Sequence, residues 1–233
     1  MSAQNRLPLA LLVAGGAVTS ALAYRYLLRP WYLRWGATDA EADGPLPGDD
    51  FVEAPQHQDT HAVTIDAPPE EVWPWLVQIG QDIGQDKGGF YSYTWLENLV
   101  GCRMRNADTI LPAYQRLHAG DTVRLHPTAP PIPVGQIESG HSLVLGQHED
   151  RERDPLGGTW AFALQPEGRS RTRLLARSRW TWRPGLWNWI GYYLLLEPAH
   201  FIMERKMLLG IKARAERHSR RQGRPAVSID PTV

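Results

Sequence analysis

The sequence predicts an α+β fold in which a curved antiparallel β-sheet surrounds a long C-terminal helix, preceded by one N-terminal transmembrane helix. Residues 159–165 and 174–182 alternate between apolar and polar side chains, as half-buried antiparallel strands do. The last helix, expected at 198–217, is apolar in most directions and therefore needs cover on more than one side. Residues 7–24 form an uncharged, largely apolar run.

Composition supports one globular domain with short appendages. The chain has 233 residues, of which 42% are hydrophobic and 21% charged, so it can build a sizeable core. Residues 36–86 carry twelve acidic side chains and no Lys or Arg, whereas residues 169–224 carry fourteen Lys or Arg and three Glu. This asymmetry either orients the molecule on a charged surface or lets the two segments pair with each other. A single cysteine, Cys102, excludes an internal disulfide and a cysteine-rich zinc site.

Residues 1–35 are interpreted as a membrane anchor with an interfacial belt. About twenty apolar residues span a bilayer, and Trp31, Tyr32 and Trp35 alternate with arginines as aromatic belts do. Three arginines follow the apolar run, which places the rest of the chain in the cytoplasm of a single-pass cell-membrane protein. A signal peptide cleaved after residues 21–23 and a buried core helix are the alternatives.

The remaining segments follow from local patterns. Residues 36–60 are acidic and rich in Pro and Gly, which is typical of a linker or of a strap over the domain. Residues 61–218 form the domain itself, and residues 219–233 form a basic tail without regular structure. Within the domain we expect strands at 61–66, 121–125, 134–137, 142–145, 159–165 and 174–182, and helices at 70–79, 93–100 and 198–217.

Several stretches resemble the START and polyketide-cyclase-like superfamily, SRPBCC. The run 65–73, IDAPPEEVW, is similar to the opening strand-to-helix signature of that superfamily. The runs 88–93, 95–98, 197–201 and 203–206 are similar to a bacterial, membrane-anchored branch of it. The resemblance extends from about Arg29 to Arg217. The immediate repetition of Ile-Gly-Gln-Asp at 79–86 departs from the pattern and is interpreted as a lengthened loop beside the cavity mouth.

The resemblance implies a deep cavity between the sheet and the last helix that holds an apolar ligand, such as a lipid, sterol or polyketide. The function favoured at this stage is therefore binding of a hydrophobic small molecule or lipid, with transport or sensing as its purpose. A cyclase- or dehydratase-like enzyme and a non-catalytic, membrane-tethered interaction module remain as alternatives, because a fold does not determine a function. The side chains expected to line the cavity are Trp73, Trp95, Trp160, Phe162, Trp180, Met203 and Met207.

Weak candidates for catalysis are Glu97, His141 and Glu204, with His200 as a packing or capping residue. Glu204 interrupts the apolar arc of the last helix, and a buried carboxylate there could act as a general acid or base. A salt bridge between Glu204 and a sheet arginine is the favoured explanation. His57 and His61 have the i, i+4 spacing of a metal pair, but the segment between them is expected to be linker rather than helix, and no third ligand is apparent. We therefore predict no metal and no cofactor.

Two further surfaces are ambiguous. Arg171, Arg173, Arg177 and Arg179 form a ladder on one face of the strand at 174–182, which is either solvated or in contact with anionic lipid. No nucleic-acid recognition motif accompanies this charge, so nucleic acid is not an expected partner. Residues 187–196 are predicted to form an apolar loop. This loop either enters the bilayer or packs beneath the last helix.

Overall fold

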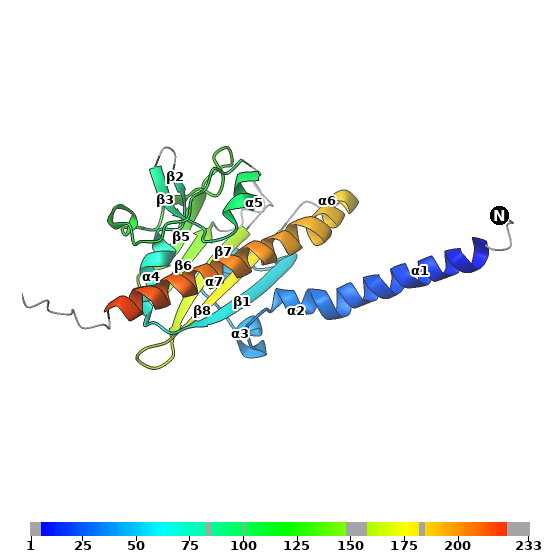
Figure 1. Cartoon of the computed structure of the whole chain (residues 1–233), viewed down its shortest axis with the longest axis horizontal. Helices are drawn as coiled ribbons and strands as arrows, with labels where there is room; N and C mark the ends of the chain where they lie inside the picture. The colour runs from blue at the N-terminus through cyan, green and yellow to red at the C-terminus, as the bar shows by residue number, and fades with distance from the viewer. Residues whose placement is uncertain (1–5, 83–84, 100, 148–157, 182–184, 223–233) are drawn as a thin grey trace, which may run out of the picture.

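The computed structural model describes residues 6–82, 85–99, 101–147, 158–181 and 185–222. A six-stranded antiparallel sheet in the order β1-β8-β7-β6-β5-β4 forms the centre of the molecule (Figure 1). A separate two-stranded sheet pairs β2 with β3. The strands are β1 (His57–Ile65), β2 (Gly80–Asp82), β3 (Gln85–Gly89), β4 (Thr122–Val123), β5 (Ile132–Glu138), β6 (Ser142–Gly146), β7 (Gly158–Pro166) and β8 (Thr172–Trp180).

One long helix, α7 (Glu197–Gln222), lies across one face of this sheet (Figure 1). It continues without a break from α6 (Leu186–Gly191) and the π-helical segment η5 (Tyr192–Leu196). At the other end of the chain, α1 (Arg6–Ala23), the π-helical segment η2 (Tyr24–Leu28) and α2 (Arg29–Leu33) form a second long helical run. The shorter elements are α3 (Asp39–Asp43), η3 (Asp49–Phe51), α4 (Pro69–Val77), α5 (Thr94–Leu99) and η4 (Pro112–Tyr114).

The core lies between the sheet and α7, as the helix-grip architecture requires. Phe162 on β7 and Leu174 on β8 are fully buried there, together with Leu208 and Ile211 of α7. The predicted alternation places the apolar side of these two strands on the core, and the fold is α+β with a six-stranded antiparallel sheet. The buried residues of α7 form one broad face, whereas Ile202 is 49% exposed, so the cover expected on most sides of this helix is found on that face only. The outer end of the predicted alternation, at Trp182, lies outside the described residues.

The acidic segment that follows α2 covers the opposite face of the sheet. Arg173 of β8 forms a bidentate ion pair with Glu41 of α3, and Arg177 bonds Asp49 and the backbone carbonyls of Glu41, Ala42 and Gly44. Arg177 is only 2% exposed. Most of the arginine ladder is thus neither solvated nor free to meet lipid, because the acidic and basic segments pair with each other.

The N-terminal helix projects away from the sheet in Figure 1. Among the helices in the described part of the chain, none combines the length and the apolarity needed to cross a membrane, so the predicted transmembrane helix is not found there. At the other terminus α7 extends to Gln222, which takes in the first residues of the predicted basic tail. Residues 223–233, and the repeated Ile83-Gly84, lie outside the described residues.

Candidate functional site

Strand β1 carries three titratable side chains on the face that meets α7. The strand begins at His57 rather than at residue 61, so residues 57–60 belong to the sheet and not to a linker. Because side chains alternate along a strand, His57, Asp59 and His61 point to the same side. All three are buried, and Val63 and Ile65 continue the same face into the apolar core.

Helix α7 presents a matching set from its first two turns. Glu197, His200 and Glu204 are separated by three and four residues, which places them on one helix face. Glu197 and Glu204 are buried. Three carboxylates and three imidazoles from two elements therefore meet at one end of the sheet, and we call Asp59, Glu197, Glu204, His57, His61 and His200 the inner cluster.

His57 bridges two carboxylates in this cluster. Its Nδ1 lies 2.9 Å from Glu197 Oε2 and its Nε2 lies 2.7 Å from Asp59 Oδ2. Burial alone would lower the pKa of His57, but its hydrogen bonds to Asp59 and Glu197 raise it. Since both ring nitrogens face acceptors, the ring is held as an imidazolium between two anions. Trp180 stacks on it at a centroid distance of 5.2 Å.

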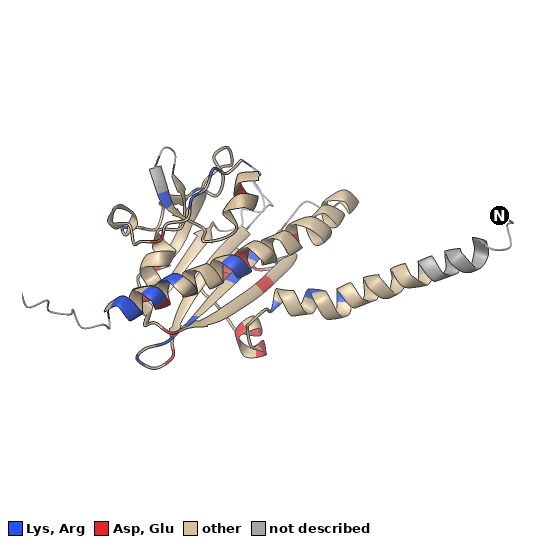
Figure 2. Ribbon diagram, in the orientation of Figure 1, with Lys and Arg blue, Asp and Glu red and all other residues tan. Residues whose placement is uncertain are grey.

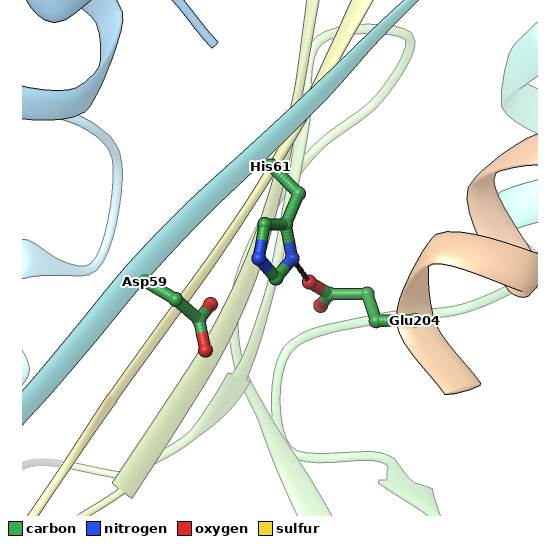
Figure 3. Close-up of side chains that lie close together, drawn as sticks. All are labelled: Asp59, His61 and Glu204. Atoms are coloured by element: carbon green, nitrogen blue, oxygen red, sulfur yellow. Dashed lines mark hydrogen bonds and ion pairs between the residues drawn. The ribbon is translucent and has the colours of Figure 1, made fainter. Parts of the chain in front are cut away.

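His61 faces Glu204 and a backbone carbonyl. Its Nδ1 contacts Glu204, toward which it points in Figure 3, and its Nε2 lies 2.8 Å from the carbonyl oxygen of Tyr32. Burial would lower the pKa of His61, but the Glu204 and Asp59 carboxylates outweigh it and raise that pKa to about 9. The Trp160 indole N–H donates to the second oxygen of Glu204.

Glu197 joins this cluster to the N-terminal helical run. Arg29 binds it through two hydrogen bonds of 2.9 Å, and the Tyr32 hydroxyl donates to the same carboxylate. Burial would raise the pKa of Glu197, but the bonds from His57, Arg29 and Tyr32 keep it below its usual value. Tyr24 also donates to the backbone carbonyl of Tyr193 at 2.7 Å. The two helical runs are therefore tied together beside the inner cluster.

Beyond this tie, both runs expose large apolar side chains. On the C-terminal run these include Trp187, which is 81% exposed, and Leu195, which is 69% exposed. On the N-terminal run Leu27 is 71% exposed and Trp31 is 56% exposed. Residues 186–196 contain no charged side chain, and α6 carries no charge colour in Figure 2. We call Tyr26, Leu27, Leu28, Trp31, Leu186, Trp187, Trp189, Leu194, Leu195 and Leu196 the apolar end.

An open groove of about 540 Å³ runs along the N-terminal part of this apolar end. Its lining is spaced by three or four residues, so it occupies one face of the α1–η2–α2 run. Since all of its lining comes from this one face, the groove is open to its surroundings rather than enclosed. The lining residues are Ser20, Ala23, Tyr24, Leu27, Leu28 and Trp31.

The residues predicted to line an internal cavity do not share one space. Phe162 and Met207 are fully buried in the main core, whereas Trp95 is 68% exposed. Trp160 packs against the same core, 5.0 Å from Phe162 between ring centroids, and also borders the inner cluster, which Trp180 borders too. Trp73 packs against the outside of the core, and Met203 lies 3.5 Å from the Ser92 hydroxyl.

The predicted catalytic candidates are also dispersed. His141 is exposed on the β5–β6 hairpin, where its Nδ1 lies 3.1 Å from the Ser139 carbonyl oxygen. Glu97 is buried on α5, and neither of its carboxylate oxygens has a hydrogen-bond partner among the described residues. Burial raises the pKa of Glu97. The favoured salt bridge between Glu204 and a sheet arginine is wrong, because Arg173 and Arg177 lie on the opposite face of the sheet, and Glu204 pairs with His61.

Sequence reasoning missed two members of the cluster, Asp59 and Glu197, and it set His57 and His61 aside because the segment between them was taken for a linker. The alternation of His57, Asp59 and His61 with Gln58 and Thr60 was available as a period-two signal. This signal was overlooked because both faces of residues 57–61 carry polar side chains, as the residues of a linker do.

No protein-family model and no curated protein matches the chain. Among the solved structures that match it is the aromatase/cyclase ZhuI of a Streptomyces species, at 12% identity over 72% of this chain and 98% of that chain, with a TM-score of 0.38. A polyketide-cyclase-like protein of Corynebacterium glutamicum matches at 12% identity over 72% of this chain and 96% of that chain, with a TM-score of 0.35. An HSP90 activator of Plasmodium falciparum matches at 13% identity over 62% of this chain and 92% of that chain, with a TM-score of 0.34. The sheet order and α7 agree with the antiparallel sheet and long C-terminal helix that the sequence predicts.

Proposed function

We propose that this protein binds the acyl chain of a lipid. Binding takes place at a membrane surface into which the apolar end inserts. The observation that carries the proposal is that two exposed apolar segments, from opposite ends of the chain, extend from one tie between Tyr24 and Tyr193. Exposed apolar patches of this kind are characteristic of membrane or ligand contacts, because they gain free energy when they leave water.

The composition of the apolar end favours a bilayer as the surface. Trp31, Trp187 and Trp189 are the side chains that prefer the membrane–water interface. Arg25 lies on the same helical run as Trp31, with its guanidinium 5.7 Å from the Tyr26 ring. An arginine at this position reaches lipid phosphates while its aliphatic stem stays in the apolar layer. The groove along Ser20–Trp31 then opens toward lipid and would accept one chain.

Vesicle flotation of the full-length chain tests the membrane contact. We expect the wild-type protein to float with phosphatidylcholine vesicles, and to float more completely when anionic lipid is added. The double variant Trp187→Glu/Leu195→Glu should lose at least tenfold in vesicle partitioning, because two charges replace apolar contacts in the bilayer.

A matched variant controls for surface hydrophobicity as such. Trp95→Glu alters an exposed tryptophan on α5, outside the apolar end, and should float like the wild type. A wild-type chain that stays with the soluble fraction, or a Trp95→Glu variant that loses flotation equally, would contradict the proposal.

Ligand binding is measured separately by native mass spectrometry after incubation with a lipid extract. We expect one bound lipid per chain and its loss in Ala23→Trp, in which the new indole fills the groove. Lipid that stays bound to Ala23→Trp at the wild-type level would show that the groove is not the site.

A further inference from the structure

The inner cluster contains the donor atoms of a metal site. One ligand atom each from Asp59, His61 and Glu204 lies within 4.8 Å of the other two, and Figure 3 shows His61 and Glu204 pointing toward one another beside Asp59. His200 adds a fourth donor: its Nε2 lies 3.7 Å from Asp59 Oδ2 and 3.6 Å from Glu204 Oε1. Around a tetrahedral ion with bonds of about 2.0 Å, neighbouring ligand atoms lie roughly 3.3 Å apart.

The two elements hold these donors in register. Asp59 and His61 are two residues apart on β1 and share its inner face. His200 and Glu204 are one turn apart on α7 and share its sheet-facing side. The ligand atoms of Asp59, His61 and Glu204 all lie within 4.8 Å of one another, and His200, whose Nε2 also bonds the Ser178 hydroxyl at 3.0 Å, lies beside Asp59 and Glu204.

Neighbouring groups orient these side chains as metal sites require. The Tyr32 carbonyl oxygen can only accept, so the Nε2 atom of His61 carries a proton, and its Nδ1 is the atom aimed at Glu204. A histidine that donates one N–H to a backbone carbonyl and offers its other nitrogen is the usual arrangement of a metal-bound imidazole. His57 holds Asp59, and the Trp160 indole holds Glu204.

The buried carboxylates of the cluster are groups that a divalent cation can bind. Without a metal, Arg29 and His57 pair with Glu197 and Asp59, and His61 pairs with Glu204. Buried charges are costly unless they are paired or coordinate a metal. A divalent ion bound to Asp59 and Glu204 would therefore displace the proton that His61 directs at Glu204.

We propose that Asp59, His61, His200 and Glu204 bind one divalent transition-metal ion, for which Zn²⁺ is the appropriate probe. Imidazole and carboxylate ligands together suit Zn²⁺ and its neighbours in the first transition row. Because four protein side chains supply the ligands, the ion holds β1 against the first turns of α7. This proposal is independent of the lipid-binding function.

Metal analysis of the untagged, full-length chain, purified without chelator, is the first test. We expect close to one metal ion per chain by inductively coupled plasma mass spectrometry. After the metal is stripped with EDTA, Co²⁺ should bind with the visible absorption of a tetrahedral site, and Zn²⁺ should abolish that absorption and raise the melting temperature. A wild-type chain that retains no metal and gives no Co²⁺ spectrum would overturn the proposal.

Variants separate this site from histidines on the surface. Glu204→Gln keeps the size of a ligand and removes its charge, and His200→Gln removes a side chain that is 21% exposed and so is less important for folding. Each should weaken Co²⁺ binding at least tenfold. His141→Gln removes an exposed histidine outside the cluster and should bind Co²⁺ like the wild type. Equal weakening in all three, or none in His200→Gln and Glu204→Gln, would overturn the assignment.

Discussion

Two polar clusters lie on opposite faces of the same pair of strands, β1 and β8, and they differ in the kind of cation that they use. On the outer face Arg173 and Arg177 meet the carboxylates and carbonyls of the acidic segment. On the inner face the carboxylates meet mainly the imidazoles of His57 and His61. Guanidinium groups stay charged at any physiological pH, whereas imidazoles exchange protons and bind metals.

The difference indicates a division of roles along this sheet edge. The outer cluster, which we define as Glu41, Asp49, Arg173, Arg177 and Arg179, ties a polypeptide segment to the sheet with fixed charges. The imidazoles of the inner cluster can exchange protons or bind a metal ion. The inner cluster adjoins the apolar end through Arg29 and Glu197. We therefore expect the outer cluster to contribute mainly stability, and the inner cluster to contribute stability together with chemistry.

The largest effect is expected from breaking the outer cluster at its buried guanidinium. Arg177→Met leaves Asp49 and three backbone carbonyls without their donor, and should lower the free energy of unfolding by about 4 kcal/mol. Urea unfolding followed by circular dichroism measures this. Arg171→Met, at a position whose side chain is 53% exposed, is the matched control and should change stability by less than about 0.5 kcal/mol. A loss below about 1 kcal/mol in Arg177→Met would contradict the assigned role.

Breaking the tie beside the inner cluster should cost somewhat less, because other partners remain. Arg29→Met removes two hydrogen bonds from Glu197, which keeps those from His57 and Tyr32. The expected loss is about 3 kcal/mol, measured with EDTA present so that bound metal does not contribute. Arg25→Met, four residues away at an exposed position, serves as the control. If both variants unfold at the same urea concentration, Arg29 does not stabilise the buried carboxylate.

The smallest expected effect is a pH-dependent loss of stability when the ion pair between Glu41 and Arg173 in the outer cluster is removed. Hydrogen bonds from Arg173 lower the pKa of Glu41 from 4.5 to about 2. Because the folded pKa lies below the unfolded one, the pair stabilises the fold above about pH 4.5, and this contribution is lost as the pH falls toward 2. Glu41→Gln should therefore cost about 1 kcal/mol at pH 7, since the pair is partly solvated, and almost nothing at pH 2. A cost that is equal at both pH values would exclude this ion pair as its cause.

The accuracy of the sequence predictions depended on how each segment meets the core. Strand β8 was predictable because Leu174 and Ala176 alternate with Arg173, Leu175 and Arg177, so its one wholly apolar face was visible. Glu204 stood out because it interrupts an apolar helix. The ion-pair partner of Glu204 was predicted wrongly because a sequence does not show which face of the sheet an arginine occupies.

The start of β1 was missed for a different physical reason. Its inner face changes from His57, Asp59 and His61 to the apolar Val63 and Ile65 only in mid-strand. Polar residues on both faces carry no hydrophobic signal, so only contact with α7, at the other end of the chain, explains why they are buried. The apolar end was partly predictable, because residues 187–196 are uncharged, although they form helical turns rather than a loop.

The wide sequence separation within the inner cluster has a consequence for biosynthesis. His61 and Glu204 are 143 residues apart, and Arg29 and Glu197 are 168 residues apart. In the described sheet β1 is an edge strand that pairs with β8, so it waits for its partner until most of the chain has been translated. At typical elongation rates the interval between His61 and Glu204 lasts roughly 10 to 30 s. During that time β1 and the apolar N-terminal helical run, which are synthesised first, stay without their partners, which makes the nascent chain a natural client for chaperones.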